Sequence, residues 1–564
     1  MAGKVRDSDG EKRNVTGIDR RQFLFSAAAL AVGTVGIEAN VLPAPASAAK
    51  LRVSAVRRPQ PSVFALNEIT VEEIQRGMQR GHFTARAITE MYLGRIEDID
   101  RAGVSLRSVI ETNPDALGIA ESLDEERKAG RIRGPLHGVP VLVKDVIDTG
   151  DRMHTTAGSL ALVGSFARKD AFIAAKLREA GAIILGKTNL SEWSSVRSTR
   201  STSGWSARGG LSRNPYVLDR TACGSSSGAA SSVASNLAAL AIGVETDGSI
   251  ACPSSANCVV GIKPTVGLLS RSGLIPVSYS QDTAGPMART VRDAAVLLGA
   301  LTGIDSRDPA TEASRGKALT DYTASLDKSA LKGARIGVIR RQHELDTQLE
   351  GVLDHSIGVM RSAGAVIIDE VDVPSVDDLQ RPETFVLICE FKDAIAEYLA
   401  TRGPEEHNKS LADLIEFNKE NADVELQWFG QEWFEASEET KGRATPDYKD
   451  ALEACHVLSR VRGLDRVLAE HRLDAVVGIA ASAPFASDMV NGDRPIVRNS
   501  SLSAVSGYPR ITVPAGFIRD LPVGLSIMGP AWSEAKLLGL AYAFEQENPV
   551  RRAPAFIPSV IVDR

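Results

Sequence analysis

The decisive stretch of the sequence reads Ala222-Cys-Gly-Ser-Ser-Ser-Gly228, then Gly243-Val-Glu-Thr-Asp-Gly-Ser249 and Gly261-Ile-Lys-Pro-Thr265. Its first part is a loop, in which glycine permits backbone angles and close approaches that a Cβ would forbid. Residues 227–240 are small and predict a tightly packed, buried helix. The turn 246–249 can present several backbone N–H groups to one point, and such convergent amides suit a developing oxyanion.

Clusters of Ser and Gly are most often plain loops, so the surrounding residues decide the meaning of this one. The loop also matches the Gly-x-Ser-x-Gly elbow of serine esterases, in which Ser226 would be the nucleophile. That elbow needs a strand directly before it, whereas residues 214–223 contain only one short apolar pair and predict a loop. An esterase would also need a distant Asp and a His, and nothing in the sequence singles out His343, His355 or His471.

An earlier apolar run, Val139-Pro-Val-Leu-Val, ends in Lys144. Together with the two serine turns, it resembles the amidase signature family. The resemblance implies that Ser249 is the nucleophile, that Ser225 is a bridging serine preceded by a cis peptide bond, and that Lys144 completes the triad. It also implies that the backbone N–H groups of the turn Thr246, Asp247, Gly248 and Ser249 form the oxyanion hole.

The likeness to this family extends over about 70–302 and again over 501–545. Cys223, Ser227 and Asp247 depart from the common family pattern, and these variants look like the branch that contains bacterial peptide amidases. The resemblance therefore implies hydrolysis of carboxamides to acid and ammonia through an acyl-enzyme, with the C-terminal amides of peptides as candidate substrates. The carboxylate of Asp247 would oppose a developing oxyanion, so we expect it to point away.

A serine is a weak nucleophile until a base takes its proton. A proton can pass from Ser249 through Ser225 to Lys144 only if the lysine is neutral, so burial must lower its pKa from about 10.4. On its own, Lys144 could equally be a strand-end lysine that reaches water. A nearby Asp145 carboxylate would raise the lysine pKa, which is the main electrostatic objection to this scheme.

Composition excludes several classes of function. The 564 residues are 43% hydrophobic, and the net charge of −6 arises from mixed acidic and basic residues. This pattern gives no electrostatic reason to expect a nucleic-acid partner or an anionic membrane. The eight histidines show no His-x-x-x-His spacing, and the cysteines show no Cys-x-x-Cys spacing. We therefore expect no metal and no cofactor.

The N-terminal segment is typical of an export signal. Asp19-Arg-Arg-Gln-Phe-Leu-Phe25 and an apolar run to Ile37 precede Ala46-Ser-Ala48, as in a twin-arginine signal with a small-residue cleavage site. A membrane anchor is the alternative, but Gly33, Gly36 and Glu38 break the run well short of the roughly 20 apolar residues that a span needs. We expect the twin-arginine machinery to export the protein to the periplasm or outside, with residues 1–48 removed and no stable membrane anchor remaining.

Five cysteines are too few for a disulfide framework in a chain of this length. Cys252 and Cys258 are close enough in sequence to pair, although buried free thiols are the preferred interpretation. Cys223 adjoins the proposed bridging serine. Because its spacing offers no histidine base, we expect Cys223 to serve in packing.

Alternating strands and helices predict an α/β fold in which helices cover a central mixed sheet on both faces. We expect a single domain over residues 49–564, with the signature core at about 134–302 and a charged helical insertion at about 382–445. Within the insertion, Trp428 and Trp433 either bury a helix against the body or line a pocket for the acyl group. Together with Ser226, they are our candidate substrate-binding residues.

Two rivals to an exported amide hydrolase remain besides the esterase. An amidotransferase subunit shares the signature core but acts in the cytosol on a transfer-RNA complex, and the export signal opposes this role. A non-catalytic exported binding protein could keep the fold, but it would have no reason to retain Lys144, Ser225 and Ser249 at matching positions.

Overall fold

The computed structural model describes residues 64–564 except 341–345, 370, 404–406, 496–499 and 561–564. The expected export signal, residues 1–48, lies outside this part of the chain. Among the described residues, no helix combines the length and the apolar character that a membrane crossing requires.

One mixed sheet of eleven strands forms the centre of the fold, in the order β1-β3-β2-β6-β8-β7-β12-β13-β11-β9-β10. Strand β2 is parallel to both of its neighbours, β3 and β6, whereas β8 and β12 are antiparallel to theirs. The strands are β1 (Val109–Thr112), β2 (Pro140–Lys144), β3 (Ile183–Thr188), β6 (Leu240–Glu245), β7 (Val260–Lys263), β8 (Thr283–Ala288), β9 (Arg335–Val338), β10 (Val366–Ile368), β11 (Ala475–Ile479), β12 (Arg510–Ile518) and β13 (Leu521–Met528), with a separate pair, β4 (Trp205–Ser206) and β5 (Gly210–Leu211).

The central strands are buried along their whole length. Every residue of β2, β3, β6, β8 and β11 is buried. Since successive side chains of a strand point to opposite faces, both faces of the sheet are covered. The predicted α/β fold with a mixed, doubly covered sheet is therefore confirmed.

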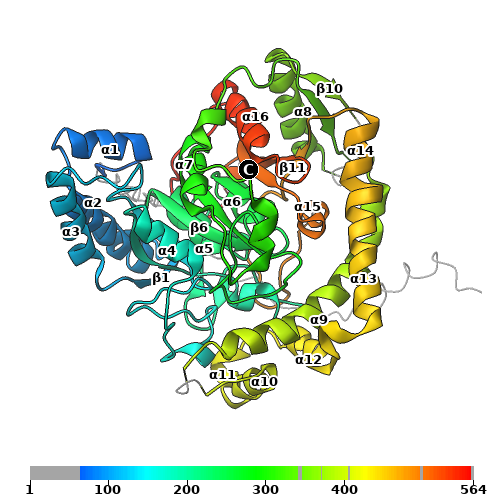
Figure 1. Ribbon diagram of the computed structural model, residues 1–564, viewed down its shortest axis with the longest axis horizontal. Helices are drawn as coiled ribbons and strands as arrows, with labels where there is room; N and C mark the ends of the chain where they lie inside the picture. Colours follow the sequence, from blue (N-terminus) through cyan, green and yellow to red (C-terminus); the bar gives the residue numbers. More distant parts are fainter. Residues whose placement is uncertain (1–63, 341–345, 370, 404–406, 496–499, 561–564) are drawn as a thin grey trace, which may run out of the picture. The chain divides into compact units, whose positions relative to one another are not determined.

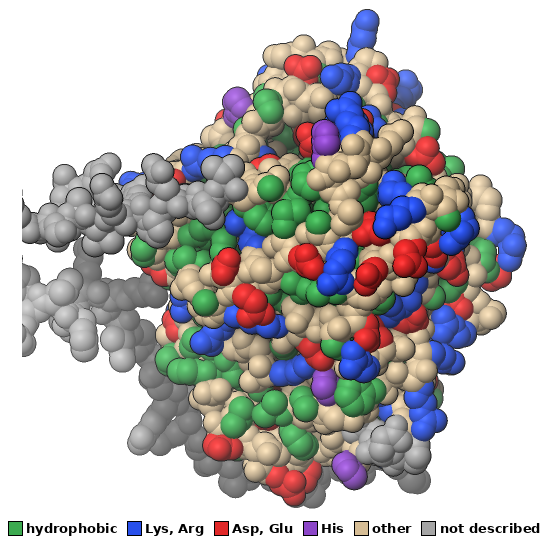
Figure 2. All heavy atoms as spheres, turned by 90° about the vertical axis from the view of Figure 1, so that its left-hand side faces the viewer, with side chains coloured by type: hydrophobic (Ala, Val, Ile, Leu, Met, Phe, Trp, Pro, Cys, Tyr) green, Lys and Arg blue, Asp and Glu red, His purple; other side chains and the backbone are tan. Residues whose placement is uncertain are grey.

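Helices surround the sheet (Figure 1), and acidic and basic side chains are interspersed on the face drawn in Figure 2. Thr70 begins the first helix with a capping box. The helices are α1 (Val71–Gln79), α2 (Ala85–Arg95), α3 (Ala116–Lys128), α4 (Phe172–Glu179), α5 (Ser227–Ala234), α6 (Ala251–Ala256), α7 (Val291–Leu301), α8 (Thr347–Ser362), α9 (Gln380–Leu399), α10 (Leu411–Glu420), α11 (Ala422–Glu425), α12 (Glu432–Glu439), α13 (Pro446–His456), α14 (Asp465–Glu470), α15 (Ser501–Ser506) and α16 (Glu534–Glu547).

The small-residue run after the serine loop differs from our prediction. We expected one helix over 227–240, but α5 ends at Ala234 and the chain then turns into the buried strand β6. Asn236 adopts a left-handed conformation with φ of 59°, which ends the helical path. Small apolar residues suit both a packed helix and a buried strand, so composition alone did not separate the two elements.

The helical segment extends further than expected, from α9 at Gln380 to the end of α14 at Glu470. Helix α9 packs against α12 and α13. Phe434 of α12 is fully buried, and its ring contacts those of Trp193 in the core and Phe391 in α9. These aromatic contacts fasten the segment to the body that carries the serine turns.

Candidate active site

Lys144 is the last residue of β2 and is fully buried. Its neighbours in the sheet, β3 and β6, enclose the strand on both edges. The Nζ atom donates hydrogen bonds to Ser225 Oγ at 2.7 Å and to the Val244 carbonyl oxygen at 3.1 Å. The structure thus joins the lysine to the bridging serine inside the protein, away from bulk water.

Burial lowers the pKa of Lys144 from 10.5 to about 7, while the carboxylates of Asp282 and Glu245 oppose this shift. Near neutral pH, about half of the lysine is therefore uncharged. Asp145 does not play the opposing role that we considered, because its carboxylate is engaged elsewhere. It accepts hydrogen bonds from the amides of Thr156 and Gly158, both at 3.3 Å.

Ser225 lies in the loop just before α5 and is almost completely buried. The peptide bond between Gly224 and Ser225 is cis. A Cβ at residue 224 would overlap Ser191 Oγ, so this position requires glycine. The amide of Ser191 also donates to the Ser225 carbonyl oxygen at 3.1 Å. These contacts fix the backbone of the loop directly beside its serine.

Ser226 has a structural role in the loop. Its side chain is fully buried, and its Oγ both donates to the Val244 carbonyl and accepts from the Val244 amide, each at 3.1 Å. The esterase elbow requires a strand directly before the serine, and no strand directly precedes Ser226. Of the three candidate histidines, His343 lies outside the described residues, and His355 contacts Asn548 at 3.3 Å. Ser226 therefore holds the loop against β6.

Ser249 closes the turn between β6 and α6. Glu245 stabilises this turn, because its Oε2 accepts hydrogen bonds from the amides of Ile250 at 2.6 Å and Ala251 at 2.9 Å. Gly248 has a φ of 76°, a left-handed conformation that favours glycine. Within the described part of the chain, the amides of residues 246–249 donate to no other residue. They are thus available to an oxygen atom in front of the turn.

The Ser249 turn lies directly against the Ser225 loop, because the amide of Ser226 donates to the Ser249 carbonyl oxygen at 3.1 Å. Thr246 Oγ1 donates to Asp282 Oδ1 at 2.6 Å. That carboxylate also accepts from the amides of Val277 and Ser278, and burial raises its pKa to about 6. Asp282 thus fixes the turn and also acts electrostatically on Lys144.

The carboxylate of Asp247 is directed to neighbouring helices. Its Oδ2 accepts a hydrogen bond from Ser501 of α15 at 2.8 Å. Burial and the adjacent Asp247 both raise the pKa of the Glu383 carboxyl on α9 well above its usual value. Glu383 Oε1 accepts a hydrogen bond from Gln281 Nε2 at 3.0 Å. The Asp247 side chain thus points toward α9 and α15.

A pocket of about 190 Å³ opens in front of Ser249. The serine turn contributes Thr246 and Asp247, and Trp433 from α12 lies on the wall. Trp428 is 44% exposed and does not line this pocket, and neither does Ser226. Sequence analysis missed the remaining wall residues, which are Ser194, Ser195, Val196, Val277, Thr384, Leu387 and Ile388.

Part of this wall has an unusual backbone. Ser194 and Ser195 on the wall, and Trp193 directly before them, adopt left-handed conformations, with φ of 54°, 72° and 49°. Such angles are uncommon for residues other than glycine and are often found at functional sites. No sequence signal marks them, since nothing in Trp-Ser-Ser predicts positive φ.

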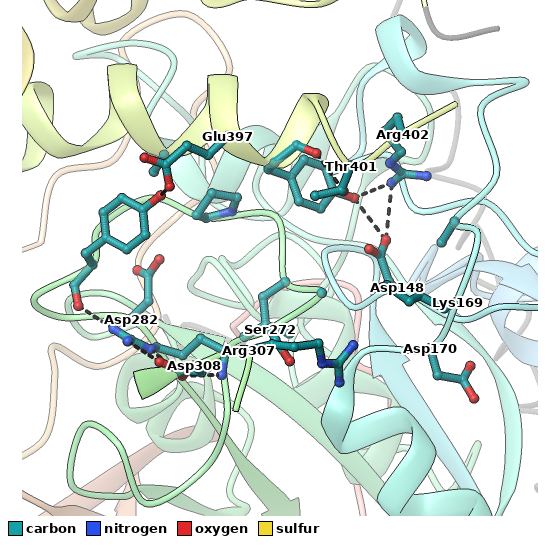
Figure 3. Close-up of a pocket in the computed structure, with 18 of the residues that line it drawn as sticks. Asp148, Lys169, Asp170, Ser272, Asp282, Arg307, Asp308, Glu397, Thr401 and Arg402 are labelled. Atoms are coloured by element: carbon teal, nitrogen blue, oxygen red, sulfur yellow. Dashed lines mark hydrogen bonds and ion pairs between the residues drawn. The ribbon is translucent and has the colours of Figure 1, made fainter. Parts of the chain in front are cut away.

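A larger pocket of about 690 Å³ lies beside α9 (Figure 3). Its charged groups form ion pairs, with Arg402 and Asp148 3.2 Å apart and Arg271 and Asp308 2.6 Å apart. Neither Ser225 nor Ser249 lines it, although Asp282 does. The smaller pocket at Ser249 is therefore the candidate active site.

A disulfide joins Cys223 to Cys252, with their Cα atoms 5.8 Å apart. The packing role expected for Cys223 is therefore wrong, and so is the preferred prediction of a free thiol at Cys252. The alternative pairing of Cys252 with Cys258 is not formed either, and the free thiol expected at Cys258 is confirmed. The loop before Ser225 folds onto the first turn of α6, whereas Cys258 lies beyond the end of that helix. Cys258, Cys389 and Cys455 are buried free thiols.

Comparison with known proteins agrees with this geometry. A family model described as Amidase matches residues 87–538. A probable amidase of Arabidopsis thaliana is 42% identical over 522 residues, which cover 91% of this chain and 94% of the relative. A glutamyl-tRNA(Gln) amidotransferase subunit from Halorhodospira halophila is 33% identical, with 85% of this chain and 97% of that relative covered.

Among solved structures, the native peptide amidase of Stenotrophomonas maltophilia superposes with a TM-score of 0.83 at 47% identity, covering 87% of this chain and 99% of that protein. The structure of the peptide amidase PAM in complex with the competitive inhibitor chymostatin has a TM-score of 0.84 at 47% identity, covering 87% of this chain and 100% of that protein. The chain belongs to the amidase signature family, and it is an amide hydrolase.

Proposed function

We propose that this protein hydrolyses carboxamides through an acyl-enzyme on Ser249, with Ser225 and Lys144 as a proton relay. The observation that carries the proposal is the 2.7 Å hydrogen bond between Lys144 Nζ and Ser225 Oγ, made by a fully buried amine whose pKa is about 7. A charged lysine cannot accept a proton, whereas a neutral one can serve as general base.

The proposed reaction uses the three side chains of the relay and the amides of the Ser249 turn. Ser249 Oγ attacks the amide carbon while its proton passes to Ser225, and the proton of Ser225 passes to Lys144. The carbonyl oxygen becomes an oxyanion, which the amides of residues 246–249 stabilise. The relay then runs backward and protonates the departing nitrogen, which leaves as ammonia. A water molecule, activated by the same relay, attacks the ester and releases the carboxylic acid.

The pocket walls support a substrate with an apolar acyl side chain. Val277, Leu387, Ile388 and Trp433 surround a volume of about 190 Å³, which suits a single side chain rather than a large ring system. Two of the similar solved structures are described as peptide amidases. We infer that the substrates include C-terminal peptide amides whose last residue is apolar.

We also propose that the protein acts in the periplasm or outside the cell, after export by the twin-arginine machinery and removal of residues 1–48. The twin-arginine pattern at Arg20 and Arg21 supports this location. The Cys223–Cys252 disulfide supports it independently, because disulfides persist in oxidising compartments and are rare in the cytosol. An oxidising location also disfavours the role of an amidotransferase subunit.

The experiment is ammonia release from a panel of amino-acid, peptide and aryl amides, measured for wild type, Ser249→Ala and Ser225→Ala. We expect Ser249→Ala to lose about 10⁴-fold or more in kcat, and Ser225→Ala to retain more activity. A covalent serine probe, followed by peptide mapping, should label Ser249. Label on Ser226 would favour the esterase, and wild-type rates in Ser249→Ala would refute the proposal.

A further inference from the structure

The two catalytic turns are linked covalently as well as by hydrogen bonds. Cys223 precedes Ser225 by two residues, and Cys252 follows Ser249 by three. The disulfide between them therefore joins the loop of the bridging serine to the turn of the nucleophile. It lies outside the proposed chemistry, since neither sulfur belongs to the proton relay.

Two hydrogen bonds cross the same junction. The amide of Ser226 donates to the Ser249 carbonyl oxygen at 3.1 Å, and Asn257 Nδ2 donates to the Ala222 carbonyl oxygen at 2.8 Å. A hydrogen bond within a protein adds little to stability, because the same groups bond to water when the contact opens. Thermal motion can therefore separate such contacts, whereas a covalent bond limits how far the turns can move apart.

The proton relay works only if the two turns stay close together. A proton passes between two hydroxyl groups only at hydrogen-bond distance, about 2.6–3.2 Å between the oxygens. The Ser225 loop is bound to β6 through Ser226 and Val244. The Ser249 turn follows β6, and the carboxylate of Glu245 at the end of that strand accepts hydrogen bonds from the first amides of α6. The Ser225 loop is thus held to the strand that carries the Ser249 turn by hydrogen bonds, and a displacement of about 1 Å can cost about 10²-fold in rate.

We propose that the Cys223–Cys252 disulfide is a positioning element that keeps Ser225 in register with Ser249, so that reduction lowers turnover while the fold persists. This inference rests on the proposed function of the two serines. Because the apolar wall residues Leu387, Ile388 and Trp433 lie on α9 and α12, away from the disulfide in sequence, its loss should act mainly on kcat and change KM less.

Cys252 is the more exposed residue of the disulfide. Cys223 is 7% exposed, whereas Cys252 is half-buried. A small dithiol can therefore attack Cys252 Sγ as a thiolate and release Cys223 as a thiol. Closure of the reagent's second thiol then frees Cys252, so that the protein gains two electrons and two protons while the dithiol becomes a cyclic disulfide.

The test compares the oxidised enzyme, the enzyme reduced with dithiothreitol, and Cys223→Ser/Cys252→Ser. Mass spectrometry after alkylation verifies reduction at both positions, and near-UV circular dichroism monitors the fold. Cys258→Ser is the matched control, since it removes a buried free thiol near α6 and leaves the disulfide intact. Ser249→Ala tests the underlying mechanism separately.

We expect reduction and the double variant each to lower kcat by about 10-fold to 10²-fold, with KM changed less than about threefold and activity restored by reoxidation. Cys258→Ser should retain its kcat, with or without dithiothreitol. Unchanged kcat after verified reduction would overturn the inference. Loss of activity that only parallels loss of near-UV signal would also overturn it, because the disulfide would then serve stability alone. If the double variant does not fold, the kcat of the reduced wild-type enzyme tests the inference alone.

Discussion

The serine-lysine centre and the helical segment from Gln380 to Glu470 meet at one pocket, but they are built differently. The centre is fixed by the sheet: Lys144 ends a buried strand, and the Ser226 hydroxyl bonds the Ser225 loop to the backbone of Val244 in β6. The helical segment contributes only side chains, such as Leu387, Ile388 and Trp433, to the wall. Chemistry thus depends on backbone placement, whereas selectivity depends on side chains that can change without disturbing it.

The largest effect should follow from Lys144→Ala. This change removes the proton acceptor of the relay, so kcat/KM at about pH 8 should fall by about 10⁴-fold while KM changes little. The measurement is steady-state ammonia release. Lys187→Met is the matched control, because Lys187 is equally buried at the adjacent strand but bonds to the Ile147 carbonyl and Thr155. A similar loss in both variants would mean that any buried lysine matters only to the fold.

A smaller effect should follow from Trp433→Ala, which changes the part of the pocket wall formed by the helical segment. Enlarging the pocket removes apolar contact with the acyl side chain, so KM for an apolar peptide amide should rise by about 10-fold. The kcat should change by less than about threefold, since the relay is untouched. Trp428→Ala is the control, because this tryptophan is exposed and does not line the pocket. A fall in kcat without a change in KM would contradict the division of roles.

The smallest effect concerns pH. The Asp282 carboxylate favours the charged form of Lys144, so Asp282→Asn should lower the lysine pKa and enlarge the neutral fraction below pH 7. The acidic limb of the kcat/KM profile should therefore move to lower pH, by about one unit. Asp308→Asn is the control, since Asp308 lines the same large pocket but pairs with Arg271. An upward shift in Asp282→Asn would contradict this electrostatic account.

The same contrast explains what the sequence could predict. Strand β11 and the Thr70 capping box follow local patterns, and the serine turns carry motifs that resemble a known family. The predicted helix over 227–240 runs past the true end of α5 at Ala234 and misses the turn before β6, because its small apolar residues fit either element. The pocket wall on α9 and the Cys223–Cys252 bond depend on segments that meet only in three dimensions. The spacing of residues along the chain does not show which distant segments come into contact, so only the structure could reveal these features.

The central claim is that a neutral Lys144 accepts the proton that leaves Ser249 through Ser225. The most direct test is the pH dependence of kcat/KM for a peptide amide, measured from about pH 5 to about pH 9. With a lysine pKa of about 7, the rate should fall about tenfold for each unit below that pH and level off above it. A rate that stays constant across this range would show that no group of this pKa acts as the base, and it would contradict the mechanism.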